Sequence, residues 1–190
     1  MMTPEENDLL CRVEGDAPMG QLMRRHWIPA CMSEEVAEPD GTPIRVRLLG
    51  EDLVVFRDSD GKLGVLDEYC PHRRASLVLG RNEECGLRCL YHGWKLDVEG
   101  NVLEMTSEPT ESGFAGKVRH KAYPAREGAG FVWTYMGPAE TMPEFEPPSF
   151  APTGAKEGLV YSENDTDMVG LRTSCRAAAA GSVTRRQSCK

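Results

Sequence analysis

The chain has 190 residues, a formal net charge of −8 at pH 7, and 19 glycines and 13 prolines that together make up about a sixth of it. This Gly and Pro content exceeds the usual ~12% and favours short strands and loops over long helices. The acidic charge disfavours a nucleic-acid partner. We expect a cytoplasmic protein with no membrane association, because the sequence shows neither a signal peptide nor a run of about 20 apolar residues.

Residues 1–41 carry a helical pattern and are interpreted as a short N-terminal lead-in that packs on the domain. Asn7 or Asp8 would cap a first short helix. Apolar residues then recur at roughly helical spacing, namely Met19, Leu22, Met23 and Trp27. The methionines are more typical of core filling than of metal ligation.

Residues 42–140 show the pattern of a small antiparallel β domain, so the predicted fold class is mainly β. From residue 44 to 69 apolar and polar residues alternate, with breaks at Gly50 and at Asp60-Gly61. This pattern predicts two strands joined by an Asp-Gly turn. Residues 90–105 repeat the design around Glu99-Gly100-Asn101, and residues 130–138 form a further strand-like run.

The composition changes twice after the β domain. Residues 141–167 are rich in proline and acidic side chains, which indicates a linker or the remaining start of a catalytic domain. Residues 168–190 hold five basic residues and no acidic one. With little apolar patterning, this tail is predicted to be irregular and largely disordered.

Two short loops each place a cysteine beside a histidine. Cys70 and His72 form Cys-x-His, and Cys89 and His92 form Cys-x2-His, with sixteen residues between His72 and Cys89. Two thiolates and two imidazoles can ligate either zinc or an iron–sulfur cluster. The odd total of seven cysteines, in a chain expected to be cytosolic, also favours metal ligation over a disulfide framework.

The mixture of ligands within each loop bears on the choice of metal. Zinc sites usually draw a Cys pair and a His pair from separate segments. Mixed loops suit a two-iron cluster in which one iron takes both cysteines and the other takes both histidines. A structural zinc module that serves binding only is the alternative.

The stretch "CPHRRASLVLGRNEECGLRCLYHGWKLDVEG" resembles the Rieske [2Fe-2S] motif. It is similar to the N-terminal Rieske domain of aromatic-ring-hydroxylating oxygenase alpha subunits, and "MGQLMRRHWIPACMSEEV" resembles the lead-in of the phthalate and phenoxybenzoate dioxygenase branch. The resemblance covers about residues 5–150. It implies a Rieske cluster with Cys70 and Cys89 on one iron and His72 and His92 on the other.

Two departures from Rieske relatives qualify this expectation. Neither loop has the second cysteine that respiratory-complex Rieske proteins use for a disulfide, which favours a low-potential oxygenase or ferredoxin type. The oxygenases also bind a mononuclear Fe(II) with two histidines and a carboxylate. After His92 only His120 remains, so that iron site is not supported in this chain, and a truncated or frame-shifted reading frame would explain it.

The resemblance implies electron transfer through the Rieske cluster, as the N-terminal part of an oxygenase alpha subunit acting on aromatic acids. The alternative is a stand-alone ferredoxin-type carrier, although such a carrier needs no lead-in of this length. The expected partners are a flavin/iron–sulfur reductase or a ferredoxin as electron donor, and oxygenase subunits, as a homo-oligomer in the full-length form. Arg73 and Arg74 follow a ligand directly and either receive an acidic patch of a partner or form a solvated basic pair. The chain alone is expected to relay electrons without oxygenating a substrate.

Overall fold

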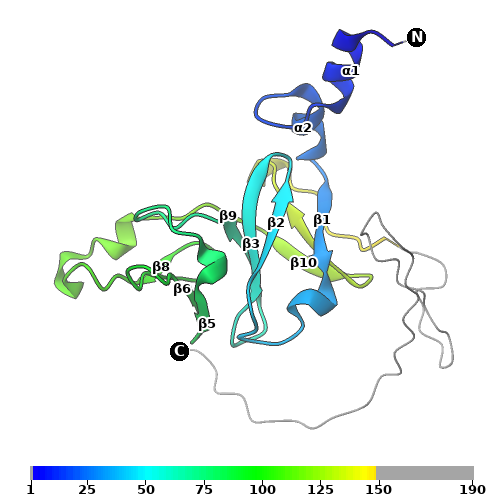
Figure 1. Cartoon of the computed structure of the whole chain (residues 1–190). Coiled ribbons are helices and arrows are strands. Elements are labelled where there is room, and N and C mark those ends of the chain that lie inside the picture. Colours follow the sequence, from blue (N-terminus) through cyan, green and yellow to red (C-terminus); the bar gives the residue numbers. More distant parts are fainter. Residues whose placement is uncertain (1, 149–190) are drawn as a thin grey trace, which may run out of the picture. The chain divides into compact units, whose positions relative to one another are not determined.

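The computed structural model describes residues 2–148 and confirms a mainly β fold. The predicted disordered tail at 168–190 and most of the predicted linker lie outside the described residues. Within residues 2–148 the strands form three antiparallel sheets (Figure 1). The first sheet has the order β1-β11-β10 and consists of Trp27–Met32, Phe131–Tyr135 and Ala125–Gly128. The second has the order β2-β3-β4-β9 and consists of Ile44–Leu48, Glu51–Arg57, Leu63–Asp67 and Ala122–Tyr123. The third has the order β5-β6-β7-β8 and consists of Arg81–Glu83, Gly86–Arg88, Lys95–Leu96 and Val102–Glu104.

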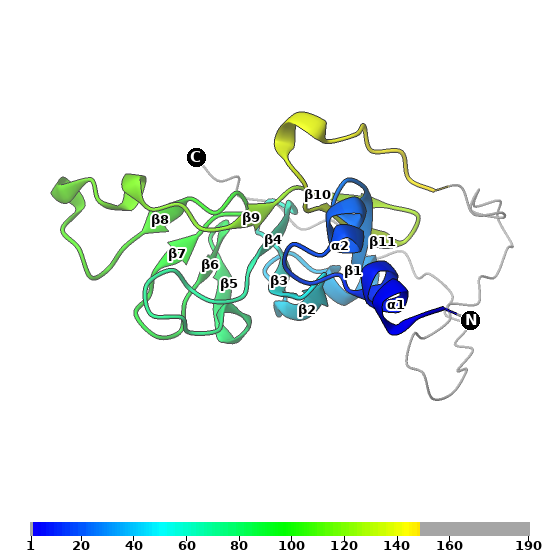
Figure 2. The same cartoon turned by 90° about the horizontal axis from the view of Figure 1, so that it is seen from above.

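The third sheet belongs to a long excursion of the chain. Strands β4 and β9 are hydrogen-bonded neighbours, with Val65 opposite Tyr123 and Leu66 opposite Ala122. The intervening residues 68–121 leave the second sheet after β4 and return to it at β9. We call residues 68–121 the small lobe, and residues 27–67 with 122–136 the large lobe. Figure 2 shows β5 to β8 on one side of β2 to β4, with β1, β10 and β11 on the other.

The central strand β3 explains how the two lobes share one sheet. Leu53, Val54, Val55 and Phe56 are all fully buried, because alternate side chains of the strand enter two different cores. A strand buried on both faces carries a continuous apolar run. The large-lobe core consists of Val36, Leu49, Leu53, Val55, Val65, Val132 and Met136. The small-lobe core consists of Val54, Phe56, Leu66, Cys70, Leu77, Leu87, Cys89, Trp94, Leu96, Val102 and Met105.

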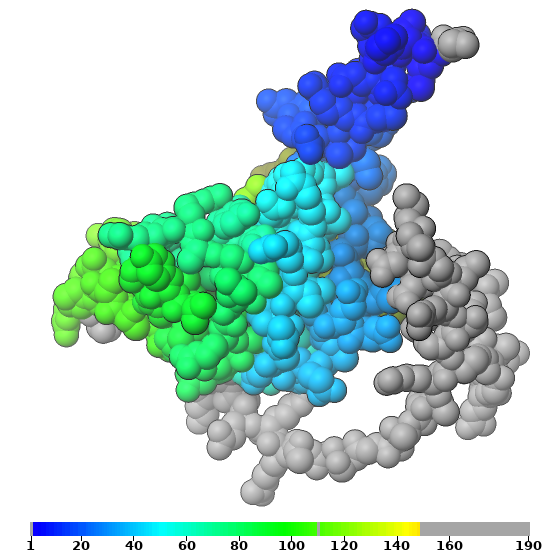
Figure 3. Space-filling view, viewed as in Figure 1, coloured from blue at the N-terminus to red at the C-terminus, as the bar shows by residue number. Residues whose placement is uncertain are grey.

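The N-terminal lead-in differs from its prediction in two ways. Helix α1 (Pro4–Cys11) is capped by Thr3, whose side chain accepts from the Glu6 backbone N–H at 3.2 Å while Glu6 Oε2 accepts from the Thr3 N–H at 2.8 Å. This reciprocal capping box, with proline at the first helical position, places the start earlier than Asn7 or Asp8. Helix α2 (Pro18–Met23) ends before Trp27, which begins β1. No residue of α1 is buried, and Figure 3 shows these helices standing out from the sheets.

The predicted strands are present, with one more than expected between residues 44 and 67. The break at Gly50 separates β2 from β3, and the turn at Asp60-Gly61 separates β3 from β4, so the segment forms three strands and not two. Short 3-10 helices occupy Ser33–Val36, Leu77–Leu79, Thr110–Ser112, Ala115–Lys117 and Ala139–Thr141. Within residues 2–148, no helix has the length and apolar character needed to cross a membrane.

Candidate functional site

The first Cys/His loop follows β4 and is a closed hairpin. A β-bridge joins Tyr69 to Ser76 at its neck. The backbone N–H of Cys70 donates to the Ala75 carbonyl at 2.9 Å, and that of Arg74 donates to the Cys70 carbonyl at 3.0 Å. These bonds turn the chain back on itself within six residues. We call residues 69–76 loop 1.

The second Cys/His loop joins β6 to β7 and has the same construction. The Cys89 N–H donates to the Trp94 carbonyl at 2.8 Å, and the Gly93 N–H donates to the Cys89 carbonyl at 3.1 Å. Gly93 has φ +70°, a conformation that side chains disfavour. We call residues 89–94 loop 2. In both loops the cysteine occupies the neck and the histidine lies further out.

The structure brings the two predicted thiols together in the small-lobe core. Cys70 is 1% exposed and Cys89 is 3% exposed. Burial, and then the neighbouring Cys89, raise the pKa of the Cys70 thiol from 9.0 to about 11. Two buried, adjacent thiols from different loops are a suitable pair of ligands for one metal ion.

The two predicted histidines form a second pair. The rings of His72 and His92 have centroids 4.5 Å apart at an interplanar angle of 69°. Trp94 stacks on His72 with centroids 4.8 Å apart and planes at 6°, and Tyr91 lies against His92 with centroids 3.8 Å apart. Partial burial, followed by the charge of His72, lowers the pKa of His92, which favours the neutral imidazole.

One atom of the pair indicates where a metal would bind. His72 Nδ1 is buried and has no hydrogen-bond partner within residues 2–148. Buried polar atoms are nearly always satisfied, so an orphaned imidazole nitrogen calls for an explanation. A metal ion bound at this nitrogen would satisfy it. In the described part of the chain, no group of three or more His, Cys, Asp or Glu side chains is placed to hold one metal ion.

The other two histidines lie elsewhere. His26 is exposed, between α2 and β1. His120 is 6% exposed, and its Nε2 is 2.9 Å from the Asp67 carbonyl oxygen. Burial lowers the pKa of His120, so the neutral ring can donate to this carbonyl. Neither joins the His72 and His92 pair.

The two arginines after His72 have different surroundings. The guanidinium of Arg74 lies 4.8 Å from the centroid of the Tyr69 ring, and its NH1 is 3.9 Å from Asp67 Oδ1. The Arg74 side chain therefore already has two partners within the domain. Arg73 is exposed beside the histidine pair.

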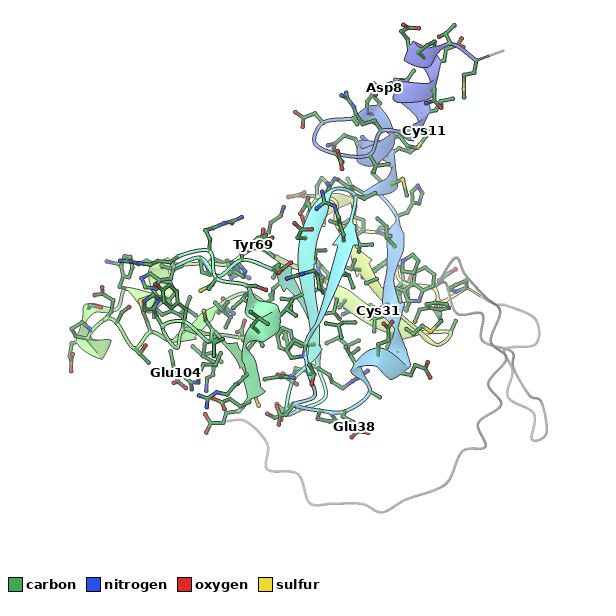
Figure 4. The ribbon with its side chains drawn as sticks, in the orientation of Figure 1. Asp8, Cys11, Cys31, Glu38, Tyr69 and Glu104 are labelled. Atoms are coloured by element: carbon green, nitrogen blue, oxygen red, sulfur yellow. The ribbon has the colours of Figure 1, made fainter. Side chains whose placement is uncertain are left out.

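Sequence reasoning missed several side chains that hold the loops. Thr106 donates through its hydroxyl to the His92 carbonyl, and Ser107 accepts from Trp94 Nε1 at 3.0 Å. Glu68 and Arg88 precede the two cysteines and make buried polar contacts. Their position beside the ligands is visible in the sequence, but their partners are not. Figure 4 labels Tyr69, at the neck of loop 1, and Glu104, which contacts Arg88.

The two loops, their paired ligands and the surrounding sheets match a known family. The sequence profile of the Rieske [2Fe-2S] domain matches residues 26–124. The chain belongs to the Rieske [2Fe-2S] domain family. Its cofactor is a Rieske [2Fe-2S] cluster, which serves electron transfer, and the predicted resemblance is confirmed.

Similar proteins place this Rieske domain among oxygenase subunits. The chain is 71% identical over 152 residues to the phthalate 4,5-dioxygenase oxygenase subunit of Pseudomonas putida, covering 80% of this chain and 35% of that protein. It is 45% identical over 172 residues to the 3-chlorobenzoate-3,4-dioxygenase oxygenase subunit of Comamonas testosteroni, covering 90% and 38%. It is 42% identical over 134 residues to the phenoxybenzoate dioxygenase subunit alpha of Ectopseudomonas oleovorans, covering 70% and 32%.

Solved structures agree with these sequence relationships. A crystal structure of dicamba monooxygenase bound to dicamba is 25% identical, with a TM-score of 0.57 over 67% of this chain and 36% of that chain. The present Rieske domain thus spans about a third of the length of the proteins it matches.

Proposed function

We propose that Cys70 and Cys89 bind one iron of the Rieske cluster and that His72 and His92 bind the other. The observation that carries this assignment is the pairing itself, with two buried thiols together and two imidazoles together. Rieske centres differ from all-cysteine clusters in having two histidines on one iron. The unpartnered Nδ1 of His72 supports the same assignment.

The bound cluster would accept and donate one electron at a time. The protein's own residues set the conditions for this exchange. Trp94 is 5% exposed and covers one face of the His72 ring, so it restricts water on that side. Tyr91 is 60% exposed beside His92, so the histidine pair is the part of the site nearest to solvent. An electron donor would therefore approach from the histidine side.

The similar proteins suggest the biological setting. We propose that the domain relays electrons within a ring-hydroxylating oxygenase that acts on aromatic acids, because the phthalate and 3-chlorobenzoate enzymes carry such substrates in their names. Its donor would be a flavin/iron–sulfur reductase or a ferredoxin, and its assembly a homo-oligomer of oxygenase subunits, in the cytoplasm. Exposed Arg73 would contribute more than Arg74 to docking an acidic donor, because Arg74 already contacts Tyr69 and Asp67.

Metal and sulfide analysis tests the ligand assignment. Protein produced with iron and sulfide available should contain about two irons and two acid-labile sulfides per chain. Cys70→Ser, Cys89→Ser, His72→Ala and His92→Ala should each lose the cluster and its electron paramagnetic resonance (EPR) signal. His26→Ala is the matched control, because it removes an exposed histidine that belongs to neither loop. Stoichiometric zinc without sulfide would contradict the assignment.

The reduction potential provides a second test. We expect a midpoint toward the low end of the Rieske range, roughly −150 mV, because the domain is acidic and negative surroundings disfavour adding an electron. Protein-film voltammetry measures it directly. A midpoint well above zero would argue against the low-potential oxygenase type.

A single-turnover reaction tests whether this chain only relays electrons. After His92 the sequence offers one histidine, His120, and its Nε2 already contacts the Asp67 carbonyl. We therefore expect the reduced chain to form no hydroxylated product from phthalate and O₂. Product above that of a His92→Ala control, detected by mass spectrometry, would reveal a second iron site and contradict the proposal.

A further inference from the structure

We propose that Glu68 and Arg88 are positioning residues, each of which closes the neck of one ligand loop and so sets the spacing between its cysteine and its histidine. The proposal rests on the ligand assignment given above. Both residues are charged, precede the cysteine of their loop, and reach across the neck to its far side. Neither belongs to the four ligands.

Glu68 closes loop 1. Its side chain is 1% exposed, and Oε1 accepts from the Ser76 hydroxyl at 2.6 Å. Glu68 precedes Cys70 by two residues, and Ser76 ends the loop, so this bond spans the neck. A main-chain hydrogen bond spans the neck as well: the Leu77 N–H donates to the Glu68 carbonyl at 2.7 Å.

Arg45 compensates the buried charge of Glu68. Its Nε donates to Glu68 Oε2 at 2.7 Å, and its NH2 donates to Oε1. Arg45 lies on β2, in the second sheet. Loop 1 is thus fixed to the large lobe through one carboxylate, and bidentate charge-assisted bonds give this attachment a defined geometry.

Arg88 closes loop 2 and ties it to two strands. Its NH1 donates to the Gly93 carbonyl at 3.0 Å, across the neck of the loop. Its Nε donates to Glu83 Oε1 at 2.6 Å and its NH2 to Glu104 Oε2 at 2.9 Å. The Arg88 side chain is 15% exposed. Since Gly93 follows His92 directly, the guanidinium holds the main chain beside this ligand.

These contacts bear on the cluster for a general reason. Mutating a residue that orients a metal ligand typically costs about 10- to 100-fold in metal affinity. Losing an ion pair also costs stability, but less than in a fully buried pair, because the Arg45, Glu83 and Glu104 side chains are 57%, 34% and 43% exposed. An ordinary ion pair would show only the second effect, so the test must measure the site as well as stability.

Arg81 provides a matched control for Arg88. The two residues are direct partners in the β5–β6 ladder, and both contact Glu83 Oε1, at 3.5 Å from Arg81 and 2.6 Å from Arg88. The Arg81 side chain is 69% exposed and makes no hydrogen bond to loop 2 among the described residues. Arg81→Gln and Arg88→Gln therefore remove the same charge from the same hairpin, but only Arg88→Gln frees the Gly93 carbonyl.

The experiment compares cluster-loaded variants of the whole chain. We expect Arg88→Gln to release iron to a chelator about 10-fold faster than wild type and to change the EPR line shape. Arg81→Gln should match wild type in both measurements. Arg88→Lys keeps the charge but has one donor nitrogen instead of three, so it should remain defective. Glu68→Gln should behave like Arg88→Gln. Its control is Asp52→Asn, which removes a carboxylate from β3, the strand next to that of Arg45, and should behave like wild type.

The outcomes separate this proposal from the ligand assignment. If Arg88→Gln and Arg81→Gln release iron equally fast and give the same EPR spectrum, Arg88 has no positioning role. Full rescue by Arg88→Lys would likewise assign a purely electrostatic role. Should Arg88→Gln fail to fold, the folded Arg88→Lys variant carries the same comparison. Wild-type protein that binds no iron or sulfide would instead overturn the ligand assignment, and this proposal with it.

Discussion

The two hydrophobic cores of the molecule share a sheet, but only one of them contains candidate metal ligands. The large-lobe core consists of aliphatic side chains and Met136, and it contains none of the proposed ligands. The small-lobe core contains the two thiols of Cys70 and Cys89, next to an unpartnered imidazole nitrogen of His72. Because metal binding is coupled to folding, the proposed ligand assignment predicts that the order of the small lobe depends on iron and that of the large lobe does not.

Iron removal should produce the largest difference between the lobes. We expect chelation under reducing conditions to expose the amides of residues 69–96 to hydrogen exchange, because both ligand loops lose the bonds that join them. The amides of Trp27–Met32 and Phe131–Tyr135 should stay protected, because these two paired strands pack on the large-lobe core, which contains none of the proposed ligands. Mass spectrometry of peptides from both lobes measures this contrast. An equal loss of protection in both lobes would contradict the separation.

A pair of leucine truncations should sharpen the comparison. Leu53 and Leu87 are both 0% exposed, the first in the large-lobe core and the second in the small-lobe core. Either leucine-to-alanine change should lower the free energy of unfolding by about 3 kcal/mol, measured by urea denaturation. Only Leu87→Ala should also weaken cluster retention. Equal iron retention in the two variants would show that the small-lobe core does not shape the site.

Two glycines allow a smaller test of the same idea. Gly93 in loop 2 has φ +70°, and Gly130 in the large lobe has φ +82°. A Cβ at Gly93 would lie 3.2 Å from Thr106 Oγ1, whereas one at Gly130 would meet nothing within 4 Å. Each alanine substitution should cost about 1 kcal/mol of unfolding free energy for the left-handed backbone. Gly93→Ala should in addition alter the EPR spectrum, and an unchanged spectrum would mean that loop 2 tolerates displacement.

The junction between the lobes should show a weak pH dependence. Burial holds the pKa of His120 below its ordinary value of 6.5. The unfolded chain therefore binds this proton at a higher pH than the folded chain does. Stability is fully present above the ordinary pKa and is lost as the pH falls through it toward the folded-state pKa.

His120→Asn should remove this part of the acid sensitivity, because asparagine has a donor but no titratable group. Urea midpoints at about pH 7.5 and about pH 5.5 compare the two proteins. Wild type should lose more stability over this interval than the variant. An equal loss would show that other groups dominate the response.

The sequence by itself identified the candidate ligands and most of the local elements around them. The spacing of Cys70, His72, Cys89 and His92 predicted the ligand set, and the structure brings these residues together in two pairs. The apolar run of β3 and the glycine turns indicated a β domain, because strands and turns depend on the pattern of neighbouring residues in the sequence. The third strand between residues 44 and 67 was also marked, by the break at Gly50, although it was interpreted as part of a two-strand unit.

Only the tertiary structure decided which distant segments meet. Trp27 continues a helical pattern locally, yet it begins β1 because Trp27–Met32 pairs with β11 about a hundred residues later. Similarly, the sequence shows Glu68 and Arg88 only as two charged residues. The structure shows that Glu68 contacts Arg45 and Ser76 and that Arg88 contacts the Gly93 carbonyl. A charged residue shows in the sequence that it needs a partner, but non-local packing selects the partner. The candidate ligands could therefore be proposed from the sequence, whereas the contacts of Glu68 and Arg88 could not.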